Sequence, residues 1–165
     1  HFTEIPRLIL HTLKDTTKKI MILEKGWHAY CNSIGKNHSL EEIKMITSKL
    51  MMSYGAATWD YAPIHYDILA ARNLGFPAPI ADGQMFGSFL VQVVQTWAGH
   101  YAHISNLQFR NKRVVFAGDE IICKGYVDEK CESEKSIVCK LWIETHDKQI
   151  ILDDALAVVL FRPAR

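Results

Sequence analysis

Two acid/base side chains, Asp60 and His65, lie five positions apart with Pro63 between them. A helix would place positions five apart on poorly matched faces, and Pro63 disfavours helix at Ala62. We therefore expect an irregular segment that folds back and brings the carboxylate and the imidazole together around one water. Such a pair could perform general acid/base chemistry. Taken alone, however, an Asp and a His at this spacing are more often joined by a simple loop hydrogen bond.

The surrounding residues favour the catalytic interpretation, because the stretch resembles the signature of the MaoC-like dehydratases. These include (R)-specific enoyl-CoA hydratases with a hotdog fold. The matching residues, all at the family's spacing, are Tyr54, Thr58, Asp60, Pro63, Ile64, His65, Asp67, Ala71 and Phe76. There are two departures: Trp59 stands where the family usually has Gly, and Ala62 where it has Asn. The missing Asn removes a hydrogen-bonding side chain beside the pair and bears on substrate preference.

The resemblance implies a role for each of three catalytic residues. Asp60 is the base that activates water, and His65 holds the same water and assists proton transfer. The backbone N–H of Gly83 binds the thioester oxygen at the start of a helix, where N–H groups are unpaired and carry partial positive charge. Glycine also lets a ligand approach the backbone closely.

The candidate substrate-binding residues fall into two groups. Apolar and polar side chains near the pair are expected to line an acyl pocket: Trp59, Tyr61, Ile64 and Ser88. Basic side chains would meet the phosphates of coenzyme A: Arg110, Lys112 and Arg113. A solvated basic edge is the competing interpretation of the second group.

Neither a metal nor a redox cofactor is expected. His65 and Asp67 could be read as a metal pair, but no third ligand is apparent in the sequence, and Asp67 is better placed to cap a helix. The cysteines include no CxxC pair, and Cys123 and Cys139 lie in strand-like segments where buried thiols are expected. The only cofactor-like molecule is the coenzyme A thioester, as substrate.

The apolar patterns predict an α+β chain. The strongest helical pattern follows Asp82, a plausible N-cap, and ends at Gly99; shorter helices are predicted over 48–54 and 68–74. Strands are predicted over 40–46, 107–115, 120–128, 136–145 and 149–161. The resemblance makes this a single hotdog fold over residues 34–165, with an antiparallel sheet of about five strands wrapped around a central helix. Residues 1–33 would be an N-terminal extension.

Composition limits the classes of partner. The chain has 165 residues and a net charge of +1, which gives no indication of nucleic-acid binding. No apolar run approaches the roughly 20 residues of a membrane-spanning helix. The cytoplasm is the default compartment for such cysteine usage. An exposed sheet edge, together with the resemblance, favours a homodimer or a higher homo-oligomer.

The resemblance, with Asp60 and His65 both present, implies an acyl-CoA dehydratase/hydratase that reversibly adds water to a trans-2-enoyl thioester, carried by coenzyme A or acyl carrier protein. Two other classes stay open. A thioesterase on the same fold would use the activated water to cleave acyl-CoA. A non-catalytic acyl-CoA-binding subunit would complete the site of a partner, which Asp60 and His65 argue against and Ala62 mildly favours.

Overall fold

A computed structural model describes residues 39–99 and 102–161 of the chain. Its sheet has five strands in the order β1-β3-β4-β5-β2, and every neighbouring pair is antiparallel. The strands are β1 (Ser39–Met45), β2 (Ala102–Asn111), β3 (Glu120–Cys131), β4 (Ser136–Glu144) and β5 (Ile150–Phe161). The α+β class and the expected strand number are therefore confirmed. The predicted extension at residues 1–33 lies outside the described residues.

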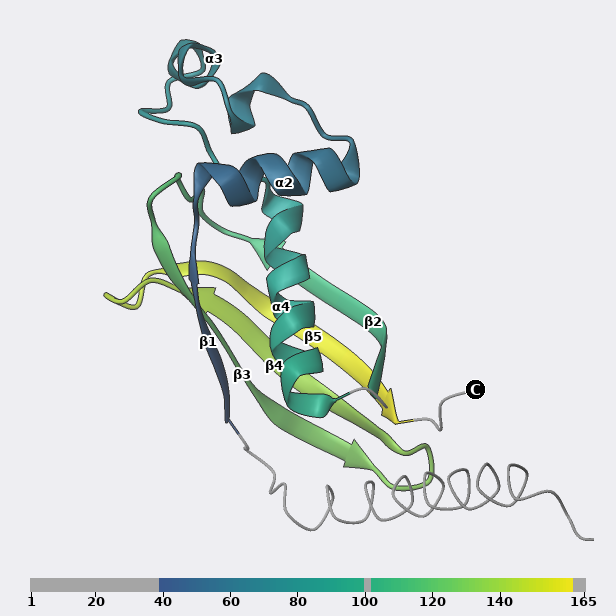
Figure 1. Ribbon diagram of the computed structural model, residues 1–165. Coiled ribbons are helices and arrows are strands. Elements are labelled where there is room, and N and C mark those ends of the chain that lie inside the picture. Colours follow the sequence, from purple (N-terminus) through teal and green to yellow (C-terminus); the bar gives the residue numbers. More distant parts are fainter. Residues whose placement is uncertain (1–38, 100–101, 162–165) are drawn as a thin grey trace, which may run out of the picture.

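The central helix α4 (Gly83–Ala98) lies along one face of the sheet (Figure 1). As predicted, Asp82 caps its start and Gly99 ends it with a positive φ of 79°. The apolar side chains that recur at helical spacing are buried except for the half-buried Trp97: Met85, Phe86, Phe89, Leu90, Val93 and Val94. They meet inward-facing strand residues such as Leu141 and Ala157 in one core. Among the described residues no helix is both long and apolar enough to cross a membrane.

Two glycines, which have no Cβ atom, allow α4 to lie close to the edge strand β2. A Cβ atom on Gly87 would lie 2.6 Å from the Phe109 ring, and one on Gly83 would lie 2.4 Å from Asn111 Nδ2. These distances are far below van der Waals contact, so larger residues would push the helix and the strand apart. The start of α4 is thereby held against the end of β2.

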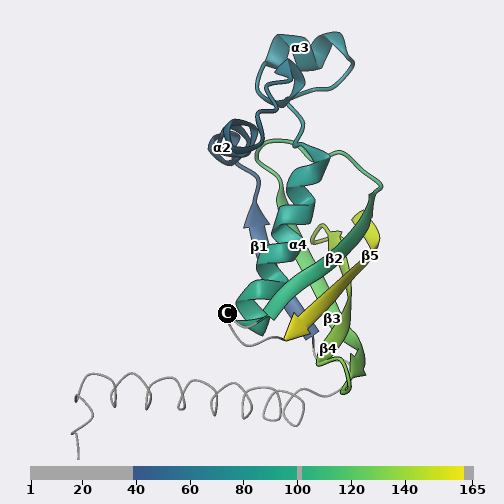
Figure 2. The same cartoon turned by 90° about the vertical axis from the view of Figure 1, so that its right-hand side faces the viewer.

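Two shorter helices, α2 (Ser48–Thr58) and α3 (Ile68–Asn73), lie beyond the end of the sheet at which α4 begins (Figure 2). Asp67 caps α3 as predicted, with Oδ1 accepting from the backbone N–H of Leu69 and Ala70. The predicted end of α2 at residue 54 is wrong, because Gly55 continues the helix. The helix stops at Trp59, which adopts the left-handed conformation.

The predicted strand over 107–115 is also shifted. The strand β2 begins at Ala102, soon after α4 ends, and leaves the sheet where the backbone N–H groups of Lys112 and Arg113 both donate to Ile151 O. Its first half alternates between half-buried and exposed positions and contains His103 and Ser105. An edge strand with so many polar residues gives a weak apolar alternation, which explains the error.

The buried thiols predicted at Cys123 and Cys139 are confirmed. Both are fully buried in the sheet, and burial raises the pKa of each to about 12. Since only the thiolate reacts with alkylating agents, both should resist iodoacetamide at pH 8 while the chain is folded. The half-buried Cys131 should react. Peptide mass mapping checks this, with the chain in guanidinium as the fully labelled control. Labelling of Cys139 in the folded chain would contradict the packing.

The left-handed turn at Trp59 gives a second prediction. Trp59 has φ 60° and ψ 23°, a conformation that costs a non-glycine residue roughly 1–2 kcal/mol. Its side chain is 83% exposed, so little burial offsets this cost. Trp59→Gly should therefore raise the free energy of unfolding by about 1 kcal/mol relative to Trp59→Ala, which loses the same side chain and keeps the strain. Urea unfolding of both variants measures the difference; equal midpoints would contradict it.

Candidate active site

The position of Asp60 is set by the end of α2. After the left-handed turn at Trp59, the backbone N–H of Asp60 donates to Gly55 O at 3.1 Å. A Cβ atom on Gly55 would lie 2.7 Å from the carbonyl oxygen of Asp60, so glycine is required for this close approach. The chain thus folds back against its own helix and delivers Asp60 to a fixed place.

The predicted irregular segment around Pro63 is a short 3₁₀ helix, η1 (Pro63–His65). Asp60 Oδ1 accepts from the backbone N–H of Ala62 at 3.0 Å, and the backbone N–H of His65 donates to Ala62 O at 3.1 Å. Ala62 therefore links the two acid/base residues through its backbone alone. One oxygen of the Asp60 carboxylate is held by this turn, and the other stays available.

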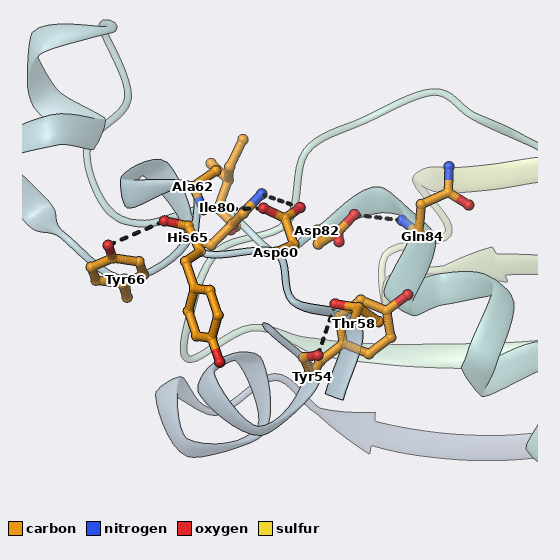
Figure 3. Close-up of polar contacts among 10 residues, drawn as sticks. Tyr54, Thr58, Asp60, Ala62, His65, Tyr66, Ile80, Asp82 and Gln84 are labelled. Atoms are coloured by element: carbon orange, nitrogen blue, oxygen red, sulfur yellow. Dashed lines mark hydrogen bonds and ion pairs between the residues drawn. The ribbon is translucent and has the colours of Figure 1, made fainter. Parts of the chain in front are cut away.

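The imidazole of His65 is oriented by a hydrogen bond to Ile80 O at 2.8 Å. A carbonyl oxygen only accepts, so Nδ1 carries the proton and Nε2 faces the other way. Nε2 lies 3.8 Å from Asp60 Oδ2, as Figure 3 allows the reader to follow. This distance is too long for a direct hydrogen bond but suits one water bonded to both atoms.

Ile80 is itself tied to the body of the fold. Its backbone N–H donates to Ile64 O at 3.2 Å, and it forms a β-bridge with Phe116. The next residue, Ala81, donates to Val115 O at 2.8 Å. The segment that carries His65 is therefore fastened to the chain that leads from β2 to β3, next to the start of α4.

Asp60 and His65 both line a cavity of about 10 Å³. Its lining residues are Met51, Tyr54, Gly55, Asp60, His65, Asp82 and Met85. This volume matches about one water, which also needs two or more polar partners, and the lining provides them. The cavity lies where α4 begins, since Asp82 and Met85 are among its lining residues.

The Tyr54 phenol is part of the polar lining of the cavity, and the Ser88 hydroxyl is hydrogen-bonded to that phenol. Burial raises the pKa of Tyr54, and the charges of Asp82 and Asp60 act in the same direction, while a hydrogen bond with Ser88 opposes them. Tyr54 therefore keeps its proton at neutral pH and can donate or accept. Ser88, predicted to line the pocket, contacts it only through Tyr54 and is not among the lining residues.

Asp82 is the main site residue that the sequence did not single out for chemistry. One carboxylate oxygen of Asp82, one of Asp60 and one ring nitrogen of His65 lie within 4.8 Å of one another. A third potential metal ligand is therefore present, which the spacing of His65 and Asp67 did not indicate. One oxygen of each carboxylate is already engaged by a backbone N–H, from Ala62 and Gln84 respectively. The signal in the sequence was an acid directly before Gly83.

The remaining predicted residues surround the cavity without lining it. Trp59 is 83% and Tyr61 56% exposed, and Ile64 is half-buried. Gly83 lies between the lining residues Asp82 and Met85, with Asn111 packed against it. The expected acyl pocket of Trp59, Tyr61 and Ile64 is therefore not formed by the described residues.

The three basic residues flank Asn111, which packs against Gly83. Arg110 is exposed at the end of β2, and Lys112 and Arg113 come just after it. Lys112 Nζ lies 3.1 Å from Asp153 Oδ1, so much of its charge is offset. The pKa of Asp147 is lowered chiefly by a hydrogen bond with Thr145, and the charge of Arg113 helps to lower it.

A larger groove of about 450 Å³ lies over β3, β4 and β5. It is lined by Tyr126, Lys140, Leu141, Trp142, Ile150, Asp153, Asp154, Ala155 and Leu156. None of these is a predicted site residue, and no nucleophile–base pair lines it. By volume this groove would be the candidate active site, but the acid/base side chains Asp60 and His65 line the smaller cavity.

The chain is similar to known proteins over this whole region. The family profile described as "MaoC like domain" matches residues 31–147. A mitochondrial 3-hydroxyacyl-[acyl-carrier-protein] dehydratase of Arabidopsis thaliana is 22% identical over 125 residues, which cover 73% of this chain and 74% of that protein.

Solved structures show the same fold. An unliganded R-hydratase of Pseudomonas aeruginosa aligns with a TM-score of 0.74 at 19% identity, covering 79% of this chain and 84% of that one. An (R)-hydratase of A. caviae involved in PHA biosynthesis aligns with a TM-score of 0.73 at 21% identity, covering 79% and 98%. With the family match and the geometry of Asp60 and His65 together, the chain belongs to the MaoC-like dehydratases and has their hotdog fold.

Proposed function

We propose that this chain reversibly adds water to a trans-2-enoyl thioester and gives a 3-hydroxyacyl thioester. The observation that carries the proposal is a water-sized cavity at the start of α4 that is lined by both Asp60 and His65, with Asp60 Oδ2 and His65 Nε2 3.8 Å apart. A carboxylate and an imidazole that share one water form the minimum device for hydration.

The residues divide the reaction between them. Asp60 takes one proton from the water as the water oxygen bonds to C3 of the enoyl group, and the π electrons move toward C2 and the thioester oxygen. The proton that Asp60 took then passes to C2, with His65 assisting, which completes the addition of one whole water and returns Asp60 to the carboxylate. Dehydration of the 3-hydroxyacyl thioester is the same path in reverse.

The charge that develops on the thioester oxygen needs a donor. The backbone N–H of Gly83 is the first in α4 and is available, because the side chain of Asp82 accepts instead from Gln84 N. The position that a Cβ would take at Gly83 is filled by the Asn111 side chain, so glycine here lets the end of β2 approach the start of the helix. The positive end of a helix of this length supports the same role.

Both the acyl chain and its carrier must lie outside the cavity, since a volume of about 10 Å³ is too small for either. Coenzyme A and acyl carrier protein both fit the proposal, with Arg110 and Arg113 as the candidate partners of a phosphate. The Arabidopsis relative is by its name a dehydratase of acyl-carrier-protein substrates. For this chain we propose a thioester substrate, and comparing the rates with coenzyme A and acyl-carrier-protein thioesters identifies the carrier.

We also propose that the active form is a homodimer. The chain leaves both edge strands, β1 and β2, unpaired on their outer sides within the described sheet. Trp59 and Tyr61 are exposed, and a second copy of the chain or the substrate would cover their side chains. An apolar wall for the acyl group is otherwise lacking among the described residues.

Replacing the base tests the proposal. Asp60→Asn keeps the shape of the side chain and removes its basicity, so the hydration rate should fall by at least about 100-fold. The assay follows loss of absorbance of the conjugated enoyl thioester across a panel of chain lengths. Asp67→Asn is the matched control, because it makes the same change at a helix cap outside the cavity and should retain activity.

Three other outcomes would contradict the proposal. Full activity in a folded Asp60→Asn protein would remove Asp60 from the mechanism. Release of free coenzyme A from a saturated acyl-CoA would indicate a thioesterase. Binding of an enoyl thioester by the wild-type chain without turnover would indicate a non-catalytic subunit.

A further inference from the structure

We propose that the cavity lined by Asp60 and His65 is a binding site for Zn²⁺, where the ion displaces the water and inhibits hydration. The inhibition rests on the proposed function, whereas the binding of the ion does not. Three potential ligand atoms, one each from Asp60, His65 and Asp82, lie within 4.8 Å of one another. All three residues line the same water-sized cavity.

One water cannot satisfy the three acceptors that converge on the cavity. The shared water has two hydrogens, which it donates to Asp60 Oδ2 and His65 Nε2, so it has none for Asp82. Oδ1 of Asp82 accepts from the backbone N–H of Gln84 at 2.8 Å, while Oδ2 has no hydrogen-bond partner among the described residues (Figure 3). A cation, unlike a water, binds lone pairs of all three side chains at once.

The charges of the site also favour a divalent cation. Asp60 and Asp82 bring two carboxylates close together, and like charges at this separation repel. Within the part of the chain that the structure describes, neither carboxylate forms an ion pair with a lysine or an arginine. With the neutral imidazole that binds metals, the three side chains carry two negative charges, which one Zn²⁺ cancels.

Each of the three ligands is already oriented by a hydrogen bond to a group outside the cluster. His65 donates its Nδ1–H to Ile80 O at 2.8 Å, which leaves the lone pair of Nε2 free for a metal. Asp60 accepts from the backbone N–H of Ala62 at 3.0 Å, and Asp82 is held in the same way as the cap of α4. Metal-binding histidines and carboxylates in proteins are held by the same kinds of hydrogen bond.

The ligand set favours zinc over magnesium. An imidazole nitrogen suits Zn²⁺, whereas Mg²⁺ prefers an octahedron of oxygens. Zinc binds nitrogen and oxygen at about 2.0–2.2 Å, so two ligands of one ion lie at most about 4.4 Å apart. Asp60 Oδ2 and His65 Nε2, 3.8 Å apart, already meet this limit, and a small movement of Asp82 completes the site.

An ion at this place stops the reaction in two ways. The cavity has room for about one water, so the ion displaces the nucleophile. The ion also occupies the lone pair with which Asp60 accepts a proton. Neither effect changes a covalent bond, so removal of the ion restores the rate.

Calorimetry with Zn²⁺ alone tests the site without using activity. Asp82→Ser, which keeps a helix cap, and His65→Gln each remove one ligand, so the Zn²⁺ affinity should fall by at least about 10-fold in both. The matched controls are Asp67→Ser, at a cap outside the cavity, and His146→Gln, whose ring contacts Glu120 at the surface. Both controls should keep the wild-type affinity, and Mg²⁺ should not displace the Zn²⁺.

The hydration assay tests the inhibition. Zn²⁺ should lower the wild-type rate, and EDTA should restore it. Asp82→Ser should need at least about 10-fold more Zn²⁺ for the same fractional loss from its own zinc-free rate.

Equal Zn²⁺ affinity in all the variants would overturn the inference, because the ion would then bind elsewhere. A hydration rate that bound Zn²⁺ leaves unchanged or raises would overturn it as well. A wild-type chain that hydrates no enoyl thioester would refute the proposed function, while the calorimetry would still decide whether the zinc site exists.

Discussion

The hydrogen bond from His65 Nδ1 to Ile80 O is the contact on which the site depends. It fixes the tautomer of the imidazole and points Nε2 toward Asp60. It also joins two loops, one after α2 and one before α4, which the hydrogen bond from the backbone N–H of Ile80 to Ile64 O links as well. Because Ile80 is bridged to Phe116, the orientation of one ring is tied to the sheet.

Asp60 is placed by an independent set of constraints. Gly55 lets the backbone of Asp60 approach the helix, Trp59 makes the left-handed turn, and Ala62 holds one carboxylate oxygen through its N–H. The turn is strained because tryptophan occupies a conformation suited to glycine. The Gly that the family usually has at this position is thus explained by backbone geometry rather than by chemistry.

Local patterns predicted the site better than they predicted its surroundings. The spacing of Asp60, Pro63 and His65 indicated a compact turn, and the cap at Asp82 followed from its position before an apolar periodic run. The sequence did not indicate that Gly55 continues α2, since a glycine there looks like a stop. It predicted the second half of β2 but missed the first half, whose polar edge residues hide the alternation.

The sequence did not predict the contacts that depend on tertiary folding. Asp82 meets Asp60 and His65 only because the Ile80 bridge brings two loops together, and no spacing along the chain reports this. Trp59 and Tyr61 look like pocket residues by type, yet both are exposed in the single chain. Residue type alone does not report exposure, because exposure is set by the tertiary fold.

A high-resolution crystal structure of the chain tests the central claim most directly. We expect one ordered water within about 3.2 Å of both Asp60 Oδ2 and His65 Nε2, with Nδ1 bonded to Ile80 O. An imidazole turned away from Ile80, with separate waters on the two side chains, would contradict the account.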